Sequence, residues 1–268
     1  MRRTYELYRE DGRQLTITRT GAGPPLLLIH GLSGSRRWWR RNLPAFETRF
    51  TVYRVELVGF GHARRQRPLP LSESADVLAR WLTHDGIGRA HVLGHSMGGH
   101  IALHLAARHP DLVRKLVLAT PTGLLRGQWW RVALKLPRAA AATHLDFVPI
   151  VATDALRAGV LNLYRASREL LRDDVAELLA RIRAPTLVVS AGRDVLVPPS
   201  LGAQLVARIP NARALLLEDA GHVVMWDEAR AFNEAVVQFL EEDDLEGDDS
   251  EEADGEEGGL REDHPGQA

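Results

Sequence analysis

The chain has 268 residues, of which 45% are hydrophobic, and this length suits one α/β domain with a sizeable core, because such domains often run to about 200 to 250 residues. It contains no cysteine, which excludes disulfides, a cysteine nucleophile and thiolate-bound metal. The formal net charge of -1 hides a separation of charge, because residues 241–268 hold 14 acidic residues against one arginine, while the preceding residues hold 33 basic residues against 21 acidic ones.

The sequence indicates neither a leader peptide nor a membrane-spanning segment. Residues 1–13 are charged and precede no apolar run of about 7 to 15 residues, and no stretch approaches about 18 uncharged apolar residues. The sequence therefore predicts a cytoplasmic protein with no stable membrane insertion. It leaves the oligomeric state open.

The predicted elements begin with an antiparallel hairpin, because alternating segments at 4–10 and 14–20 flank the turn signal Asp11-Gly12. Short runs rich in Val, Leu and Ile then recur between helical patterns, which is typical of a mainly parallel sheet with helices on both faces. The predicted strands after the hairpin lie at 25–30, 51–57, 90–95, 115–120, 186–190 and 212–218, and the predicted helices at about 72–84, 97–109, 199–208 and 227–241. This order predicts an eight-stranded, mostly parallel α/β fold.

The segment 121–184 interrupts this alternation, since it holds helical stretches such as 165–182 but no convincing strand. An insertion between parallel strands would sit over their carboxyl ends, where open α/β sheets bind ligands. We therefore expect a core domain formed by 1–120 and 185–240, with 121–184 as a helical cap insertion. The acidic segment 241–268 has almost no apolar residues to bury and is expected to be disordered.

Residues 94–98 read Gly-His-Ser-Met-Gly and match the pattern G-x-S-x-G. An apolar strand precedes the motif and a helical pattern follows it, so Ser96 would stand on a sharp turn with its hydroxyl pushed out toward substrate. The free N–H groups and the dipole at the start of a helix favour negative charge on an attacked carbonyl oxygen. Ser96 is therefore the predicted nucleophile, and the N–H of Met97 is the first predicted oxyanion donor. The alternative is that Ser96 only caps a helix.

A serine hydroxyl needs a neighbouring imidazole to accept its proton, and the imidazole needs a carboxylate to hold its tautomer. On a sheet of this type the acid and then the histidine follow the serine in chain order, in loops at the carboxyl ends of strands. Asp194 and His222 each follow a predicted strand, so we predict them as the acid and the base. Asp219 and Asp227 remain alternative acids, although Asp219 suits a turn and Asp227 a helix cap.

Five histidines crowd around the serine in the sequence, so nearness along the chain does not identify the base. They are His91, His95, His100, His104 and His109. His100 and His104 lie on the predicted helix after Ser96, and their side chains cannot reach back to the serine through that helix. We therefore assign both to packing or to the surface.

The second oxyanion donor is expected in the loop that follows the strand at 25–30. This loop contains Gly31, Leu32 and Gly34, and the glycines give the backbone the freedom to aim an N–H inward. We predict the N–H of Leu32 as the second donor. The alternatives are a turn without catalytic role and a phosphate-binding loop, but neither G-x-G-x-x-G nor a P-loop lysine is present here.

Together these motifs resemble the α/β-hydrolase family over roughly residues 4–240. Residues 26–39 are similar to its oxyanion loop, 94–103 to its nucleophile elbow, 184–199 to its acid loop, and 219–240 to its histidine loop with the closing helix. The resemblance implies hydrolysis of a carboxylic ester, lactone or related acyl bond, with no metal and no organic cofactor. The serine at the elbow makes the chain unlike haloalkane dehalogenases and epoxide hydrolases, which use an aspartate there.

The predicted function is therefore a serine hydrolase that cleaves a small-molecule ester or lactone through an acyl-enzyme on Ser96. One alternative is a carbon-carbon bond hydrolase of the same fold, although residues 30–34 lack the longer loop of that class. Another is a noncatalytic sensor of a small ligand, because a fold does not fix a function. The candidate substrate-binding side chains are Trp39, Trp129, Trp130 and Phe147.

Arginines cluster at residues 36–41 and 64–67, which makes binding to a polyanion or a membrane surface a further alternative. No aromatic-rich nucleic-acid motif accompanies them. We therefore expect no nucleic-acid partner.

Overall fold

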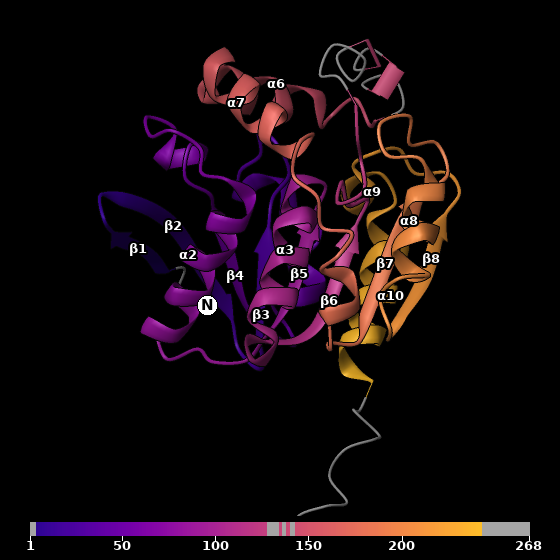
Figure 1. The fold of residues 1–268 in the computed structure, drawn as a ribbon, viewed down its shortest axis with the longest axis horizontal. Helices are drawn as coiled ribbons and strands as arrows, with labels where there is room; N and C mark the ends of the chain where they lie inside the picture. The colour runs from indigo at the N-terminus through magenta and orange to yellow at the C-terminus, as the bar shows by residue number, and fades with distance from the viewer. Residues whose placement is uncertain (1–3, 128–133, 136–137, 140–142, 243–268) are drawn as a thin grey trace, which may run out of the picture.

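The structure is a computed structural model of the chain, and it describes residues 4–127, 134–135, 138–139 and 143–242. One eight-stranded sheet runs through it, in the order β1-β2-β4-β3-β5-β6-β7-β8. β1 pairs with β2 and β2 with β4 in antiparallel orientation, and the remaining neighbours are parallel (Figure 1). The predicted mostly parallel, eight-stranded α/β-hydrolase fold is confirmed.

The bounds of the elements follow the predicted order closely. The strands are β1 (Thr4–Glu10), β2 (Arg13–Gly21), β3 (Pro25–Ile29), β4 (Thr51–Glu56), β5 (Ala90–His95), β6 (Val113–Ala119), β7 (Thr186–Ala191) and β8 (Ala212–Leu217). The α-helices are α1 (Leu43–Phe46), α2 (Leu71–His84), α3 (Met97–Arg108), α6 (Val148–Ala158), α7 (Val160–Leu170), α8 (Pro199–Val206), α9 (Val224–Asp227) and α10 (Ala229–Glu241). The short 3-10 helices are η1 (Arg36–Trp39), η2 (Gly61–Ala63), η3 (Pro110–Leu112) and η4 (Leu179–Arg181).

The central strands are apolar along their whole length because both faces of the sheet are covered. In β3, Leu26 and Leu28 pack into one hydrophobic cluster, whereas Leu27 and Ile29 pack into the other. Alternate residues of a strand point to opposite faces, so a strand between two helical layers needs apolar residues at every position. α2, α3 and α8 cover one face, and α1, α9 and α10 cover the other (Figure 1).

The hairpin at the amino terminus forms as predicted. Asp11 and Gly12 have φ values of 48° and 73°, which suits a two-residue turn with both central residues in the left-handed region. The turn sets the register that places Tyr8 opposite Leu15. The resulting ribbon joins the parallel part of the sheet through β4.

The predicted helix at 227–241 forms as α10, which begins at Ala229, two residues later than expected. A separate short helix, α9, precedes it and ends at Asp227. Glu228, whose backbone angles of -117° and 50° are not helical, separates the two. The predicted helices at 72–84, 97–109 and 199–208 agree with α2, α3 and α8 to within two residues at each end.

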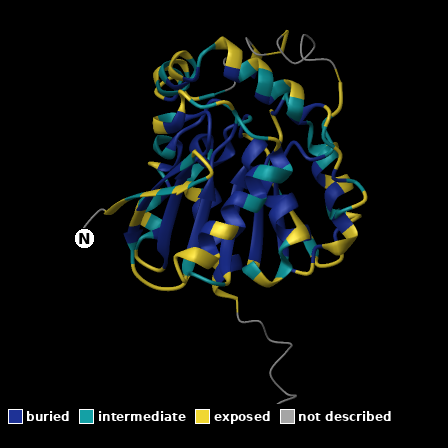
Figure 2. Ribbon diagram, turned by 60° about the vertical axis from the view of Figure 1, so that its left-hand side comes forward, coloured by how far each residue is buried: buried dark blue, intermediate teal, exposed yellow. Residues whose placement is uncertain are grey.

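In the described part of the segment 121–184, called the insertion below, α6 and α7 lie on the side of the sheet where the parallel strands end, and residues 171–184 return along α3 to the start of β7 (Figures 1 and 2). Figure 2 shows a buried layer of strands beneath helices that carry much exposed surface. α7 ends at Leu170, so the helical stretch expected at 165–182 stops early. Asp174 accepts the backbone N–H of Ala176 at 2.9 Å, and such a local bond competes with helix formation.

Two further expectations concern the surface of the molecule. Among the helices that the structure describes, none is both long enough and apolar enough to cross a membrane. The predicted disordered tail falls largely on residues 243–268, which lie outside the described residues. Its first residue, Glu241, still belongs to α10 and forms an ion pair with Arg49.

Candidate active site

Ser96 stands alone between β5 and α3, in a backbone conformation that few side chains adopt. Its φ and ψ are 53° and -115°, and a non-glycine residue at positive φ is strained. The turn is held by close backbone contacts: a Cβ atom at Gly98 would lie 2.2 Å from the carbonyl oxygen of Ile29, and one at Gly94 2.3 Å from that of Gly98. Glycine is needed at both positions because a side chain would clash with the backbone of β3 or of the turn itself.

His222 links the serine to the acid that the sequence indicated. Its Nε2 lies 3.0 Å from Ser96 Oγ, and its Nδ1 lies 2.7 Å from Asp194 Oδ2. The other carboxylate oxygen of Asp194 accepts the backbone N–H groups of Leu196 and Val197 at 2.8 and 2.9 Å. A carboxylate fixed in this way can accept a hydrogen bond from Nδ1–H, which would leave Nε2 as the ring atom available to accept the proton of the serine hydroxyl.

The surroundings of Asp194 keep it ionised. Burial opposes ionisation, but the neighbouring His222 and the hydrogen bonds to the carboxylate outweigh it and hold the pKa of Asp194 below its usual range. The Asp194 side chain has no exposed surface, and 13% of the His222 side chain is exposed. A buried, charged carboxylate stabilises the imidazolium that forms when His222 takes a proton.

The two alternative acids occupy other positions. Asp219 is exposed and pairs with Arg193. Asp227 accepts the backbone N–H groups of Gly221 and His144 at 3.1 and 3.2 Å, and burial raises its pKa. Asp227 therefore shapes the loop before His222, while Asp194 is the carboxylate in hydrogen-bond contact with the imidazole ring.

His95 has a positioning role that sequence reasoning missed. Its Nε2–H donates to the backbone carbonyl of His222 at 3.0 Å, and Thr120 Oγ1 donates to the same carbonyl at 2.9 Å. Burial, assisted by the neighbouring His222, lowers the pKa of His95 to about 3, so the ring is neutral at ordinary pH. The contact joins residues 127 positions apart, and no local pattern in the sequence could have indicated it.

The expected oxyanion loop lies directly beside the serine. A Cβ atom at Gly31 would be 3.2 Å from the Ser96 Cβ, and the Gly34 N–H donates to the Gly31 carbonyl at 3.0 Å to close a turn. The His30 side chain connects this turn to the end of β4. Its Nδ1–H donates to the Gly31 carbonyl, and its Nε2 accepts the Leu57 N–H. Burial lowers the pKa of His30, which favours this neutral tautomer.

The two residues predicted to donate to the oxyanion, Leu32 and Met97, both lie in segments next to Ser96. Met97 is the first residue of α3, and an N–H in the first turn of a helix has no acceptor within that helix. Leu32 follows Gly31 in the loop beside Ser96. The assignment of their N–H groups to a developing oxyanion stays a prediction.

Gly31→Ala is expected to lower kcat for an activated ester roughly 10- to 100-fold, because a displacement of the reacting groups by about 1 Å can have an effect of that size. The added methyl group would lie 2.8 Å from His95 Nδ1, so the loop must shift away from the serine. Steady-state kinetics measure the change. Gly86→Ala is the control: nothing lies within 4 Å of a Cβ atom there, but its φ of 64° strains an alanine, so this variant should lose some stability and keep its kcat. Equal kcat in the two variants would contradict the placement of the loop.

The predicted pocket residues are placed only in part. Trp39 is 0% exposed and Phe147 is 1% exposed, and Phe147 packs edge-on against Trp38 with ring centres 5.2 Å apart. Both side chains are thus enclosed in the described part of the chain, and their role in substrate binding stays a prediction. Trp129 and Trp130 lie outside the described residues.

A cavity of about 510 Å³ lies elsewhere, between residues 66–70 and α7. Arg13, Arg67 and Glu169 are among its lining residues, and none of the three hydrogen-bonded site residues lines it. This cavity is therefore separate from the cluster of Ser96, His222 and Asp194.

Comparison with known proteins agrees with the geometry. The family model described as alpha/beta hydrolase fold matches residues 24–154, and a second, described as TAP-like protein, matches 170–252. The chain is 30% identical over 240 residues to the pimeloyl-[acyl-carrier protein] methyl ester esterase of Neisseria meningitidis, a match that covers 80% of this chain and 92% of the relative.

Two further matches differ in how much of the relative they cover. The dihydrolipoyllysine-residue acetyltransferase component of the acetoin cleaving system of Pseudomonas putida is 31% identical over 81% of this chain, which spans 64% of that relative's length. The crystal structure of the enol-lactonase from Burkholderia xenovorans LB400 has a TM-score of 0.73 and 25% identity, covering 88% of this chain and 99% of that chain. By its motifs, its sheet topology and these matches, the chain belongs to the α/β hydrolase fold family.

Proposed function

We propose that this protein is a serine hydrolase that cleaves a carboxylic ester or lactone through an acyl-enzyme on Ser96. The observation that carries the proposal is the continuous line of hydrogen bonds from Ser96 Oγ through the imidazole of His222 to Asp194. The serine sits at positive φ on a turn, and this strained conformation has a physical reason if the hydroxyl must face a substrate.

The first half-reaction follows from this geometry. Ser96 Oγ attacks the acyl carbon while His222 Nε2 accepts the hydroxyl proton, and Asp194 stabilises the imidazolium that results. The N–H groups of Leu32 and Met97 would donate to the oxyanion of the tetrahedral intermediate, and one such donor is typically worth about 2.7 to 4 kcal/mol in the barrier. The carbon-oxygen bond then breaks, and the alcohol leaves with the proton from His222.

The second half-reaction uses the same groups. Water gives a proton to His222 Nε2 and attacks the acyl carbon, and the second tetrahedral intermediate collapses to release the acid and restore the Ser96 hydroxyl. We propose that the insertion acts as a cap over this site, because α6 and α7 lie on the side of the sheet where the strands end. Two similar proteins, named as a methyl ester esterase and an enol-lactonase, support the choice of an acyl carbon-oxygen bond.

The alternative of a polyanion-binding surface is weakened because three of the clustered arginines form ion pairs within the chain. Arg36 pairs with Glu56, Arg37 with Asp154, and Arg41 with Asp146. Arginines committed to partners within the chain are less available to phosphate groups. A small-molecule acyl compound therefore remains the proposed substrate, and no specific observation favours a second function.

Covalent labelling with a fluorophosphonate, followed by a panel of p-nitrophenyl esters and small lactones, tests the proposal. We expect the wild-type protein to be labelled at Ser96 and to turn over at least one member of the panel, and the Ser96→Ala variant to do neither. A wild-type protein that is folded but unlabelled, with turnover no greater than that of Ser96→Ala, would favour the noncatalytic sensor.

A further inference from the structure

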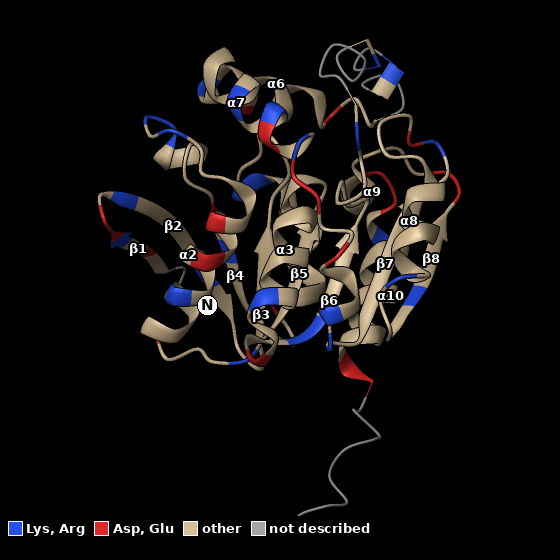
Figure 3. Cartoon of the chain, in the orientation of Figure 1, with Lys and Arg blue, Asp and Glu red and all other residues tan. Residues whose placement is uncertain are grey.

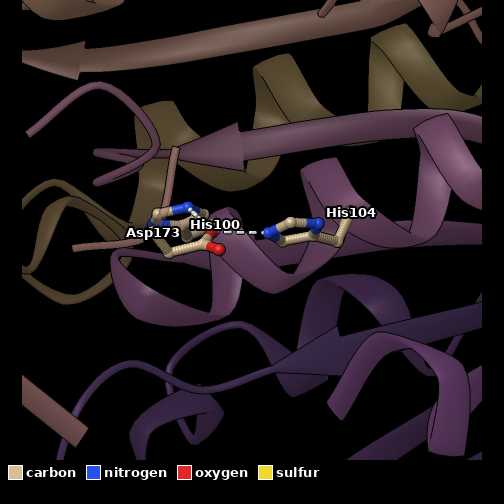
Figure 4. A group of neighbouring side chains, drawn as sticks. All are labelled: His100, His104 and Asp173. Carbon is tan, nitrogen blue, oxygen red and sulfur yellow. Dashed lines mark hydrogen bonds and ion pairs between the residues drawn. The ribbon is translucent and has the colours of Figure 1, made fainter. Parts of the chain in front are cut away.

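A second cluster of ionisable side chains lies one turn along α3 from the serine. His100 and His104 stand four residues apart on the same face of the helix, with ring centres 5.7 Å apart and ring planes within 1° of parallel. Asp173, which follows α7, reaches toward both rings (Figure 4). The sequence predicted packing or surface roles for the two histidines, and the structure buries both of them.

Most of the ring nitrogen atoms of the two buried histidines have no hydrogen-bond partner in the described chain. His104 Nε2 donates to Asp173 Oδ2 at 2.5 Å, and His100 Nε2 lies 2.7 Å from the same oxygen without the geometry of a hydrogen bond. Within the described chain, the Nδ1 atoms of both rings have no hydrogen-bond partner. Buried polar atoms normally have partners, so the convergence of two imidazoles on one carboxylate oxygen calls for a further reason.

Asp173 has no permanently charged partner among the described residues. Within the part of the chain that the structure describes, the nearby Arg126 forms an ion pair with Asp174, and no Lys or Arg forms an ion pair with Asp173. A partly buried carboxylate, whose side chain is 18% exposed, is thus left with two imidazole neighbours and no Lys or Arg partner.

We propose that His100, His104 and Asp173 form a binding site for a divalent transition-metal ion of the zinc type. Their ligand atoms, one from each residue, all lie within 4.8 Å of one another. Zn²⁺ binds imidazole nitrogen and carboxylate oxygen at about 2.0 to 2.2 Å, so small rotations of the side chains bring all three into the coordination shell. Two imidazoles and one carboxylate are a donor set that suits Zn²⁺ and its neighbours in the first transition row.

The ion would join two parts of the chain that are distant in sequence. α3 carries the two histidines and begins next to Ser96. Asp173 lies in the insertion, shortly after the end of α7. Without an ion, both imidazole rings crowd against Asp173 Oδ2. With the ion bound, each of the three side chains would instead form one bond to the cation. The proposed role is structural: the ion fastens the base of the insertion to the helix that follows the nucleophile.

The test uses the full chain, with any affinity tag removed, after treatment with a chelator. Titration with Zn²⁺ by calorimetry is expected to give one strong site per chain, and the melting temperature is expected to rise about 5 to 10 °C when Zn²⁺ is about 100 times its Kd. Asp173→Asn and His104→Asn should each remove the strong site and the rise in melting temperature. Circular dichroism before titration establishes that each variant is folded.

His109→Asn is the matched control, because His109 also lies at this helix and bonds a carboxylate, that of Asp76 at 2.8 Å, but as a single imidazole. It should bind Zn²⁺ like the wild type. Equal strong binding by wild type and Asp173→Asn would overturn the proposal, and so would the absence of binding by wild type at about 100 µM Zn²⁺, a concentration at which any site of useful affinity is filled. Neither readout depends on hydrolysis, so the result is independent of the proposed function.

Discussion

Asp194→Asn is expected to lower kcat about 10⁴-fold while the protein stays folded. The amide fits the same space and can still accept the backbone N–H groups of Leu196 and Val197. Its nitrogen, however, cannot accept the Nδ1 proton of His222, so the imidazole turns to the tautomer in which Nε2 carries hydrogen and cannot act as a base. Steady-state kinetics on the best ester of the panel, with the melting temperature measured beside them, give the result.

Two other carboxylates in the same region provide controls. Asp219 is exposed and paired with Arg193, so Asp219→Asn should leave kcat unchanged. Asp227 supports the backbone at Gly221, so Asp227→Asn should lower kcat by no more than about tenfold, because an amide oxygen can still accept one of its two N–H bonds. If Asp227→Asn lost as much activity as Asp194→Asn, the acid would be wrongly assigned.

The sequence predicted the parts of the site that depend on local pattern. Ser96 was recognisable because a strand, a glycine-flanked serine and a helix are adjacent in the chain. Asp194 and His222 were chosen by chain order, because loops at the carboxyl ends of parallel strands converge, and their catalytic roles stay a prediction. The structure brings these three side chains into hydrogen-bond contact.

Other features depend on contacts that the sequence does not indicate. The donation from His95 to the His222 carbonyl and the meeting of His104 with Asp173 join residues 127 and 69 positions apart. The early end of α7 was missed because the amphipathic pattern continues past Leu170, whereas the local hydrogen bond of Asp174 decides the outcome. Periodicity indicates which face of a helix is buried, but it does not indicate which polar partners meet there.

A buried carboxylate from the insertion is bonded to the segment that follows the oxyanion loop. Asp154, on α6, is 5% exposed; its Oδ2 accepts the Ser35 hydroxyl at 2.7 Å and the Trp38 indole N–H at 3.1 Å. Its Oδ1 pairs with Arg37 at 2.5 Å. Ser35 is the N-cap residue of η1 and lies three residues after Leu32. One side chain of the insertion therefore fixes the strand-to-helix connection that would aim the second oxyanion donor.

Asp154→Ala is expected to destabilise the fold by about 2 to 4 kcal/mol, because the buried Ser35 hydroxyl and Trp38 indole N–H lose their acceptor. For a domain of this size the melting temperature should fall by about 5 to 15 °C. We also expect kcat to fall about tenfold or more at a temperature where the variant is folded, because the loop that carries Leu32 is less well fixed. Thermal denaturation and ester kinetics, each on the purified variant, measure the two effects.

Asp146→Ala separates this coupling from a general effect of removing an acid from the insertion. Asp146 also accepts an indole N–H, from Trp226 at 3.1 Å, and also pairs with an arginine, Arg41, but 48% of its side chain is exposed. The Trp226 ring is buried, but removing the exposed Asp146 side chain lets water reach its indole N–H, so the melting temperature should fall less than in Asp154→Ala and kcat should not change. If both variants lost stability and activity equally, the burial of Asp154 would not be the cause, and its contacts with Ser35 and Trp38 would not position the loop.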